Sequence, residues 1–527
     1  KWYWEYRTGA GGSSIYGRPS LITVDEYMTQ TSNAGETSGG SAASNPNGVL
    51  FTANDGGKRI NNSDTSFGSA VSAGDIIGNA YDADTGQWFI YINNSIQASG
   101  AAISESIKGN LAGKDVYILH ERYNGNGVDV YNFGQNSTFA GATTAGGNQD
   151  DNGIGDFKYP VPSGYLALCT SNLPTPTIVD GSEYFNTVLW SGNGTSSRSF
   201  TGYNFAPDFL WAKQRSQAIS HALYDSVRGV GANSELSSNS TAAEGAGNND
   251  QYGYLSSFDS DGFTAVDGTA SPNYYFNENG QSFVGWGWKA GGTAVSNTDG
   301  SITSQVSANV DAGFSIATYT GTGANASFGH GLSSAPEMVI IKNRTDAETW
   351  VVGHNYLHAD PWNDRCLHLD TTAALDGSQN VWNATAPTSS VINIGGHNSV
   401  NGSGGDSMIA YCFANTDGYL KAGSYIGNGN ANGPFIYTGF RPAWIMFKSA
   451  TTVESWNIVD SKRNVYNVID NRLYADSSAA ESTGVALLDF TSNGFKLRAT
   501  WGSINASGQT FIYLAFAENP FKHSNAR

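Results

Sequence analysis

The sequence is poor in cysteine and in charge. Cysteine occurs only three times in 527 residues, and none of the three belongs to a Cys-x-x-Cys pair. Neither a disulfide framework nor a thiolate metal site is indicated, and we expect Cys169, Cys366 and Cys412 to be small buried residues. Charged residues make up 14% of the chain, and the net charge is −18. This balance would repel a phosphate backbone, so we expect no nucleic acid as a partner.

Long apolar runs and helical periodicity are also missing. No run of about 18 apolar residues is present to span a bilayer, so no membrane insertion is expected. The chain opens at Lys1 directly in a strand-like segment without a leader, and we expect a further segment before it. Glycine is abundant instead, with 65 residues, and aromatic residues reach 12%. Short strands joined by turns have this composition, and it predicts an all-β protein.

An internal repeat organises the last two thirds of the chain, which at this length needs several domains. Each copy begins with a Gly-x-Gly loop, has a proline 13 residues after the second glycine, and has a lysine six residues after the proline. The prolines are Pro207, Pro336 and Pro442, and the lysines are Lys213, Lys342 and Lys448. The size of a copy suits a β-sandwich or jelly-roll unit. Three separate repeats in a row are the simplest arrangement.

These patterns give a domain plan for the whole chain. We predict a β-sandwich at residues 1–168, a proline-punctuated bridge at 169–188, and repeat 1 at 189–290. A polar linker at 291–313 then leads to repeat 2 at 314–415, and repeat 3 follows at 416–527.

Candidate chemistry is sparse. Two pairs of carboxylates, Asp82 with Asp84 and Asp259 with Asp261, are candidates for a glycosidase pair or for a structural Ca²⁺. Turn chemistry explains both pairs as well, and neither extends into a full ligand series. We therefore predict no catalytic residues and no cofactor, with a structural Ca²⁺ left open.

Positions shared by the repeats favour a scaffold role. Lys213, Lys342 and Lys448 end a strand, and Asp225, His354 and Asp460 follow 12 residues later, so a hairpin could bring each pair together. Most tryptophans are expected to fill the core, Trp350 and Trp456 among them because they share a repeat position. Trp362, Trp382 and Trp501 stand in polar, loop-like surroundings and are the candidates for a ligand-facing role.

The first quarter of the chain carries a recognisable set of strands. Its features are Trp4-Glu5, the segment from Gly74 to Gly78, the strand from Trp88 to Asn94, and Asn132-Phe133-Gly134. In this order they resemble a SPRY domain, with Asn93-Asn94 in place of the usual Asn-Gly. The resemblance implies a bent, concanavalin-like β-sandwich of a kind that binds proteins, peptides or glycans.

Taken with the repeats and the ending from Phe516 to Lys522, the chain resembles tail-fibre or virion structural proteins of marine tailed phages. The resemblance implies a non-enzymatic protein on the virion surface that attaches to a host-cell glycan or receptor and contacts other virion proteins. It also implies a homotrimer. A bacterial secreted or cell-surface adhesin or filament subunit is the alternative, and a polysaccharide-degrading enzyme is a third.

Overall fold

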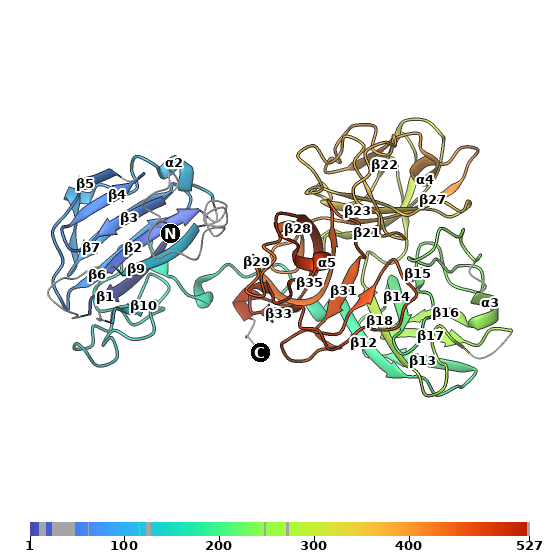
Figure 1. Ribbon diagram of the computed structural model, residues 1–527, viewed down its shortest axis with the longest axis horizontal. Coiled ribbons are helices and arrows are strands. Elements are labelled where there is room, and N and C mark those ends of the chain that lie inside the picture. Colours follow the sequence, from blue (N-terminus) through green and yellow to red (C-terminus); the bar gives the residue numbers. More distant parts are fainter. Residues whose placement is uncertain are drawn as a thin grey trace. The chain divides into compact units, whose positions relative to one another are not determined.

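The chain folds into two compact units whose regular secondary structure is almost entirely β-strand (Figure 1). The computed structural model describes residues 1–9, 17–23, 48–61, 63–114, 116–122, 128–246, 249–269 and 273–523. The first unit is Lys1–Pro174 and the second is Thr175–Arg527. Their boundary falls inside the predicted bridge at 169–188. The predicted all-β fold class is confirmed.

The first unit is a sandwich of two antiparallel sheets. One sheet has the order β10-β1-β6-β7-β8, with β11 parallel to β1, and the other has the order β5-β4-β3-β2-β9. The strands are β1 (Trp2–Arg7), β2 (Gly17–Thr23), β3 (Gly48–Thr52), β4 (Gly57–Ile60), β5 (Ser63–Ser66), β6 (Ile76–Asp82), β7 (Gln87–Ile92), β8 (Ser95–Ile96), β9 (Val116–Arg122), β10 (Val130–Asn132) and β11 (Leu166–Ala167). The described residues of this unit also form a short α-helix, α2 (Lys108–Leu111), and 3-10 turns at Ala98–Gly100 and Thr170–Asn172. Alternate residues of β7 enter the core between the sheets, as expected for strands with one inward face.

Glu5 of β1 joins distant parts of the first unit. Its carboxylate accepts hydrogen bonds from the backbone N–H groups of Lys158 and Tyr159, both at 2.9 Å, and from the Asn132 amide at 3.3 Å. Burial raises the pKa of Glu5, although these hydrogen bonds oppose the shift. Segments recognised in the sequence by Trp4-Glu5 and Asn132-Phe133-Gly134 are therefore held together by one buried carboxylate.

The second unit consists of the three repeats, and each has a large sheet facing a small one. Repeat 1 contains β12 (Phe185–Ser191), β13 (Ser197–Thr201), β14 (Phe209–Gln214), β15 (Ala222–Asp225), α3 (Asn249–Tyr252), β16 (Tyr254–Asp259), β17 (Gly262–Val266) and β18 (Ser282–Trp288). Repeat 2 contains β19 (Val295–Asn297), β20 (Ser304–Asn309), β21 (Phe314–Thr320), β22 (Ala326–Gly329), β23 (Met338–Asn343), β24 (Val351–His354), β25 (Leu367–His368), β26 (Val391–Ile394), α4 (Asn398–Asn401) and β27 (Ser407–Phe413). Repeat 3 contains β28 (Leu420–Ile426), β29 (Phe435–Tyr437), β30 (Phe440–Ser449), β31 (Asn457–Asp460), β32 (Leu473–Tyr474), β33 (Leu488–Thr491), β34 (Gly494–Leu497), α5 (Gly502–Asn505) and β35 (Thr510–Pro520).

The large sheet has the same topology in each repeat, whereas the small sheet has three strands in repeats 1 and 3 and two in the described part of repeat 2. The large sheets share the order β12-β18-β14-β15, β21-β27-β23-β24 and β28-β35-β30-β31. The small sheets are β13-β17-β16, β22-β26 and β29-β34-β33. The gapless match of the three sequences thus corresponds to three copies of one β-sandwich.

The central strands β14, β23 and β30 are buried on both faces, which explains their unbroken apolar runs. On β14, Leu210 and Ala212 enter the interior of repeat 1, whereas Phe209 and Trp211 point the other way. On β23, the outward pair is Met338 and Ile340. A strand with one solvated face would alternate apolar and polar residues, so each large sheet must have an apolar partner.

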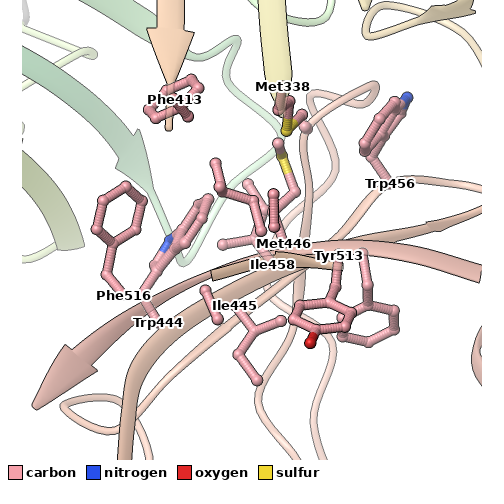
Figure 2. Packing of buried hydrophobic residues seen from close by; sticks show 14 of the residues in the cluster. Met338, Phe413, Trp444, Ile445, Met446, Trp456, Ile458, Tyr513 and Phe516 are labelled. Carbon is pink, nitrogen blue, oxygen red and sulfur yellow. The ribbon is translucent and has the colours of Figure 1, made fainter. Parts of the chain in front are cut away.

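That partner is the other two repeats. The outward residues of all three large sheets form one core, and each pair of repeats meets in it through aromatic rings. Phe209 stacks on Tyr411 with 4.5 Å between ring centroids, Trp288 lies edge-on to Trp444 at 5.7 Å, and Phe413 lies edge-on to Phe516 at 6.1 Å. Figure 2 shows Met338 and Phe413 of repeat 2 beside Trp444, Met446 and Phe516 of repeat 3. The repeats close into a ring around a shared axial core.

Two expectations are corrected by this arrangement. The repeats are not separate bodies in a row, because their sandwiches each leave an apolar face that only the ring can bury. The predicted linker at 291–313 also carries structure: β19 pairs with β20, and β20 pairs with β21, which extends the large sheet of repeat 2. β19 is an edge strand of this sheet and is paired on one side only, a position that polar residues fit.

The chain enters and leaves the second unit at adjacent points. The 3-10 turn Gly181–Glu183 packs on β35, and a Cβ on Gly181 would lie 2.5 Å from the carbonyl oxygen of Ala517. Further out, the ammonium group of Lys522 lies 3.4 Å from the hydroxyl of Thr175.

Candidate functional site

The Gly-x-Gly loops that mark the repeats are backbone clamps. In each repeat one buried asparagine fixes the loop, and these residues are Asn277, Asn401 and Asn505. The side-chain oxygen of Asn505 accepts the N–H of Asn428 at 2.8 Å, and its carbonyl accepts the N–H of Gly429 at the same distance. The second glycine has a positive φ near +70° in every copy, and a Cβ on the first would collide with backbone. The motif is therefore structural.

The three equivalent lysines are buried among carbonyl oxygens. Lys448 donates to the carbonyls of Ser449 and Thr452 in its own repeat and of Thr372 in repeat 2, and Lys342 repeats this pattern. Burial lowers the pKa of Lys213 to about 7 and of the other two to about 8. The expected pairing of Lys213 with Asp225 is wrong, because Asp225 lies opposite Phe209 at the other end of the hairpin.

Asp225 and its equivalents lie instead at the contacts between repeats, which we call seams 1–2, 2–3 and 3–1 after the repeats they join. In seam 1–2 the Tyr411 hydroxyl donates to Asp225 at 2.7 Å. In seam 3–1 the Trp286 indole donates to Asp460 at 3.0 Å. In seam 2–3 His354 donates to the carbonyl of Tyr513 at 3.2 Å. One position of the repeat thus binds the next repeat in all three seams.

Seams 1–2 and 3–1 contain matching buried charge networks. In seam 3–1, Arg463 pairs with Asp460 at 2.5 Å and with Glu481 at 2.8 Å, and Glu481 also pairs with Arg215 of repeat 1 at 2.6 Å. The corresponding residues of seam 1–2 are Arg228, Asp225, Glu244 and Arg344. The pKa of both buried arginines is raised, because the attraction of the neighbouring carboxylates outweighs burial.

In seam 2–3 other residues take the place of all four members of this charge network. At the equivalent positions it has His354, Leu357, Leu375 and Ala450. The backbone contact survives in all three seams: the N–H of Glu244 donates to Arg344, that of Leu375 to Ala450, and that of Glu481 to Arg215, at 2.8 to 2.9 Å. Geometry is therefore common to the seams, and the side-chain chemistry differs.

The carboxylates that the sequence offered as catalytic or Ca²⁺ candidates are used in turns. Asp82 accepts the N–H of Asp84 at 3.1 Å and pairs with Lys1 at 3.2 Å. Asp259 binds the hydroxyls of Ser257 and Thr264, whereas Asp261 binds the backbone of Gly202 and Asn204. Within the described part of the chain, no group of three or more His, Cys, Asp or Glu residues is placed to hold a metal ion.

Two of the three ligand-facing tryptophans are corrected. Trp362 and Trp382 are buried in the interior of repeat 2, where their rings meet edge to face at 5.2 Å over Gly353. Their indole N–H groups donate to Asn355 and to the carbonyl of Arg365. The polar neighbours that suggested a surface position in the sequence therefore serve to satisfy buried indoles.

Trp501 is on the surface, with 37% of its area exposed. It immediately precedes α5, and the guanidinium of Arg472 lies 4.4 Å from the centre of the indole. Arg472 also lies 5.1 Å from the Tyr474 ring, and a Cβ on Gly502 would lie 2.8 Å from the Glu454 carboxylate. We call Trp501, Arg472, Tyr474 and Glu454 the Trp501 platform. Sequence reasoning missed Arg472 and Glu454, because only the fold brings them beside Trp501.

The platform combines an apolar ring with charged groups of both signs. Arg472 is held in place, since its backbone exchanges hydrogen bonds with Ser482 at 2.9 and 3.0 Å. A guanidinium over an indole is a favourable cation–π arrangement that fixes the ring. Such a surface can stack the apolar face of a sugar on Trp501 while Glu454 accepts hydrogen bonds from its hydroxyls.

A hollow of about 490 Å³ lies beside the turn after β18. Asp208, Lys289, Asn309 and Asp311 are among its lining residues. The carboxylate of Asp208 is already bound by Ser226 and by the N–H groups of Ala290 and Gly292, so it supports the turn. The Trp501 platform is accordingly the stronger binding candidate.

Three findings concern the chain as a whole. None of the helices in the described ranges is long and apolar enough to cross a membrane. A comparison with curated proteins found no match. Residues 180–520, which include all three repeats and the closed ring, match the family described as Domain of unknown function (DUF7483). Because the match covers more than half of the sequence, the chain belongs to the DUF7483 family.

Proposed function

We propose that the protein is a non-enzymatic virion surface protein, a tail fibre or related appendage, that attaches a tailed phage to a glycan on its host. The observation that carries the attachment role is the Trp501 platform, an exposed aromatic surface fixed on a rigid ring. The resemblance of the whole chain to phage tail-fibre proteins supports the virion location. The SPRY-like order of motifs in the first unit, two of whose residues, Glu5 and Asn132, are joined by a hydrogen bond, supports a binding role for that unit as well.

Rigidity supports this role. Recognition by a surface protein benefits from contacts that are fixed before binding, since less conformational freedom is then lost. The shared axial core and the three seams hold the platform on a unit of more than 300 residues. The contact with Arg472 also fixes the Trp501 side chain before binding, so less conformational freedom of this side chain is lost.

The homotrimer implied by the resemblance would have to use other surfaces. The apolar faces of β14, β23 and β30, which could join three copies, are already buried within a single chain. Sedimentation of the intact protein measures its assembly state directly.

Location is tested by immunogold electron microscopy of the source material with antibody against residues 180–527. Label on the tails or spikes of particles is expected. Label confined to cell envelopes or free filaments, with bare particles, would overturn the virion proposal and leave the adhesin alternative.

Attachment is tested by glycan-array binding with the intact protein and the Trp501→Ala variant. Binding to a set of neutral or uronic-acid glycans is expected, with at least a tenfold loss in the variant, since a stacked base or ring on an aromatic residue is worth about 1–3 kcal/mol. The matched control is Tyr466→Ala, which removes another exposed aromatic residue of repeat 3, 73% exposed, outside the platform. Equal binding by wild type and Trp501→Ala would refute the platform as the contact.

A further inference from the structure

The two seams of repeat 3 each contain one buried histidine that bridges to the neighbouring repeat. In seam 3–1, His221 of repeat 1 contacts the carbonyls of Tyr474 at 2.9 Å and Ser477 at 3.2 Å. In seam 2–3, His354 of repeat 2 contacts the carbonyl of Tyr513 at 3.2 Å. Both side chains are buried.

Seam 1–2 is built without such a histidine. At the position of His221 it has Trp350, whose indole donates to the carbonyls of Ser237 and Ser240. At the position of His354 it has Asp225, bound by Tyr411. Repeat 3 is therefore the one repeat with a histidine bridge on both sides, among the residues that the structure describes.

Hydrogen bonds fix both histidines in the neutral form. The Trp211 indole N–H can only donate, and it lies 2.8 Å from Nδ1 of His221, so Nδ1 is an acceptor and Nε2 carries the proton. In the same way the backbone N–H of Tyr356 donates to Nδ1 of His354 at 3.2 Å. A second proton would have to go on Nδ1, and it would break these hydrogen bonds and charge a buried ring.

The surroundings oppose that second proton. The pKa of His221 is lowered to about 3, mainly by burial and also by the nearby cations Lys213 and Arg463, although the hydrogen bonds to the carbonyls of Tyr474 and Ser477 oppose the shift. Burial lowers the pKa of His354 to about 4, and the hydrogen bond to Tyr513 opposes only part of the shift. The other titratable groups beside them are Glu481, which pairs with Arg463 and Arg215, and Tyr356 and Tyr513 around His354. Seam 2–3 also contains His368, whose carbonyl accepts the Trp456 indole N–H and whose ring lies 3.7 Å from Asp376 within repeat 2. Asp370 and Asp476 lie at equivalent positions behind Trp350 in seam 1–2 and Trp456 in seam 2–3, and both have raised pKa values, so they do not distinguish seam 2–3 from seam 1–2.

We infer that acidification opens the ring at repeat 3, through both of its seams, before it opens seam 1–2. A seam that opens exposes its histidine to solvent, where it accepts a proton readily. In the folded protein the pKa values of His221 and His354 lie below the ordinary value for histidine. The two seams are therefore at full stability when the pH is above about 6.5, and they are weakened as the pH falls toward 4. At about pH 5 each opening is favoured about thirtyfold relative to neutral pH.

The three equivalent cross-seam amides provide one reporter for each seam. Hydrogen exchange is followed at the amides of Glu481 for seam 3–1, Leu375 for seam 2–3 and Glu244 for seam 1–2, at neutral pH and at about pH 5, with correction for the intrinsic exchange rate. The protection of Glu481 and Leu375 is expected to fall by at least tenfold, and that of Glu244 to stay unchanged. Equal loss at Glu244, or no loss at the other two, would overturn the inference on the wild-type protein alone.

The double variant His221→Gln, His354→Gln identifies the groups responsible. An amide keeps a donor and an acceptor but does not titrate, so the pH effect at Glu481 and Leu375 should disappear. His330→Gln is the matched control: His330 is buried with the same pattern of bonds, to Leu332 and Thr388, but inside repeat 2. This variant should open at repeat 3 as the wild type does. A pH effect that persists in the double variant would refute the assignment to these histidines.

Discussion

Arg463 and Arg228 are each fully buried beside two carboxylates in a seam between repeats. A buried ion pair is costly to desolvate and is stable only while every partner is present. Seam 2–3 shows that the same backbone geometry also accepts an uncharged set. Mutations in the seams can therefore measure two separate effects on the free energy of unfolding: that of removing one charged partner, and that of replacing the whole network by uncharged residues.

Removing one member of the network should be worse than removing all of it. We predict that Arg463→Leu lowers the free energy of unfolding by about 3–5 kcal/mol, because Asp460 and Glu481 lose their buried partner. The combined change Asp460→His, Arg463→Leu, Glu481→Leu and Arg215→Ala, which copies seam 2–3, should recover most of that loss. Urea unfolding measures both.

A surface pair provides the control. Arg498 pairs with Asp489 at 2.6 Å and is 41% exposed, so Arg498→Leu should change stability by less than about 1 kcal/mol. A similar cost at Arg498 and Arg463 would contradict the importance of burial.

Glu235 is a second residue with a distinct pH signature. Its side chain is buried, and burial raises the pKa to about 8 against a smaller opposing effect of Arg228. The folded protein therefore binds a proton more tightly than the unfolded chain, and the stability linked to it is complete below about pH 4.5 and is lost as the pH rises through 8.

Replacing Glu235 by glutamine should remove this dependence. Between about pH 5 and 8 the wild type should lose about 1.4 kcal/mol per pH unit more than Glu235→Gln. Urea unfolding at a series of pH values tests it, and parallel curves for the two proteins would rule out the raised pKa.

At the level of single residues, sequence reasoning located the repeat positions but not their partners. The spacing identified Lys213 and Asp225 as two positions that recur in every repeat. The pairing expected between them is absent, because the hairpin places them at opposite ends. Only the structure shows that Trp501 is exposed whereas Trp362 and Trp382 are buried. All three have polar neighbours in sequence, and only burial decides which neighbours bind a core indole and which face solvent.

Among the elements, the strands β14, β23 and β30 carry the clearest sequence signal. The sequence predicts that Lys213, Lys342 and Lys448 end a strand, and each is the next-to-last residue of its strand. The element that covers the second apolar face of these strands could not be predicted, since an apolar run looks the same in sequence whether it packs on a helix, a sheet or another repeat. The segment with β19 and β20 was missed for the opposite reason, because both strands are largely polar and β19 is an edge strand.

The loop clamps form the next testable element. Asn505 donates to the carbonyls of Ala499 and Asn430 and to the side chain of Asn428. Asn505→Ala should destabilise the protein by about 2–3 kcal/mol, because it leaves buried carbonyls without a donor. Thermal or urea unfolding measures the loss. Asn430→Ala, on the exposed part of the same loop, should cost less than about 1 kcal/mol, and equal costs would contradict the clamp.

As a whole molecule, the second unit behaves as three sandwiches with one indivisible core. The chain divides after Pro174, inside the bridge expected at 169–188, and the three sandwiches contain the three repeats that the spacing indicates. The closure of the repeats into a ring was not predictable, because equal repeats are compatible with a row or a ring. Only the apolar faces of the large sheets decide between them.

The ring predicts that no repeat is stable alone. A fragment of residues 175–415 lacks repeat 3 and would expose the rings that face Trp444 and Phe516, so it should aggregate or unfold. Coexpression with residues 416–527 should recover a soluble one-to-one complex, measured by size-exclusion chromatography. A soluble, folded 175–415 fragment would show that the axial core is dispensable.

The adjacency of Gly181 to Ala517, and of Thr175 to Lys522, has a mechanical consequence. Tension applied along the chain enters and leaves the second unit at almost one point, so the load passes across the contact between the 3-10 turn and β35 and does not stretch the seams. When the chain is pulled at these two points, the ring and the Trp501 platform would keep their shape.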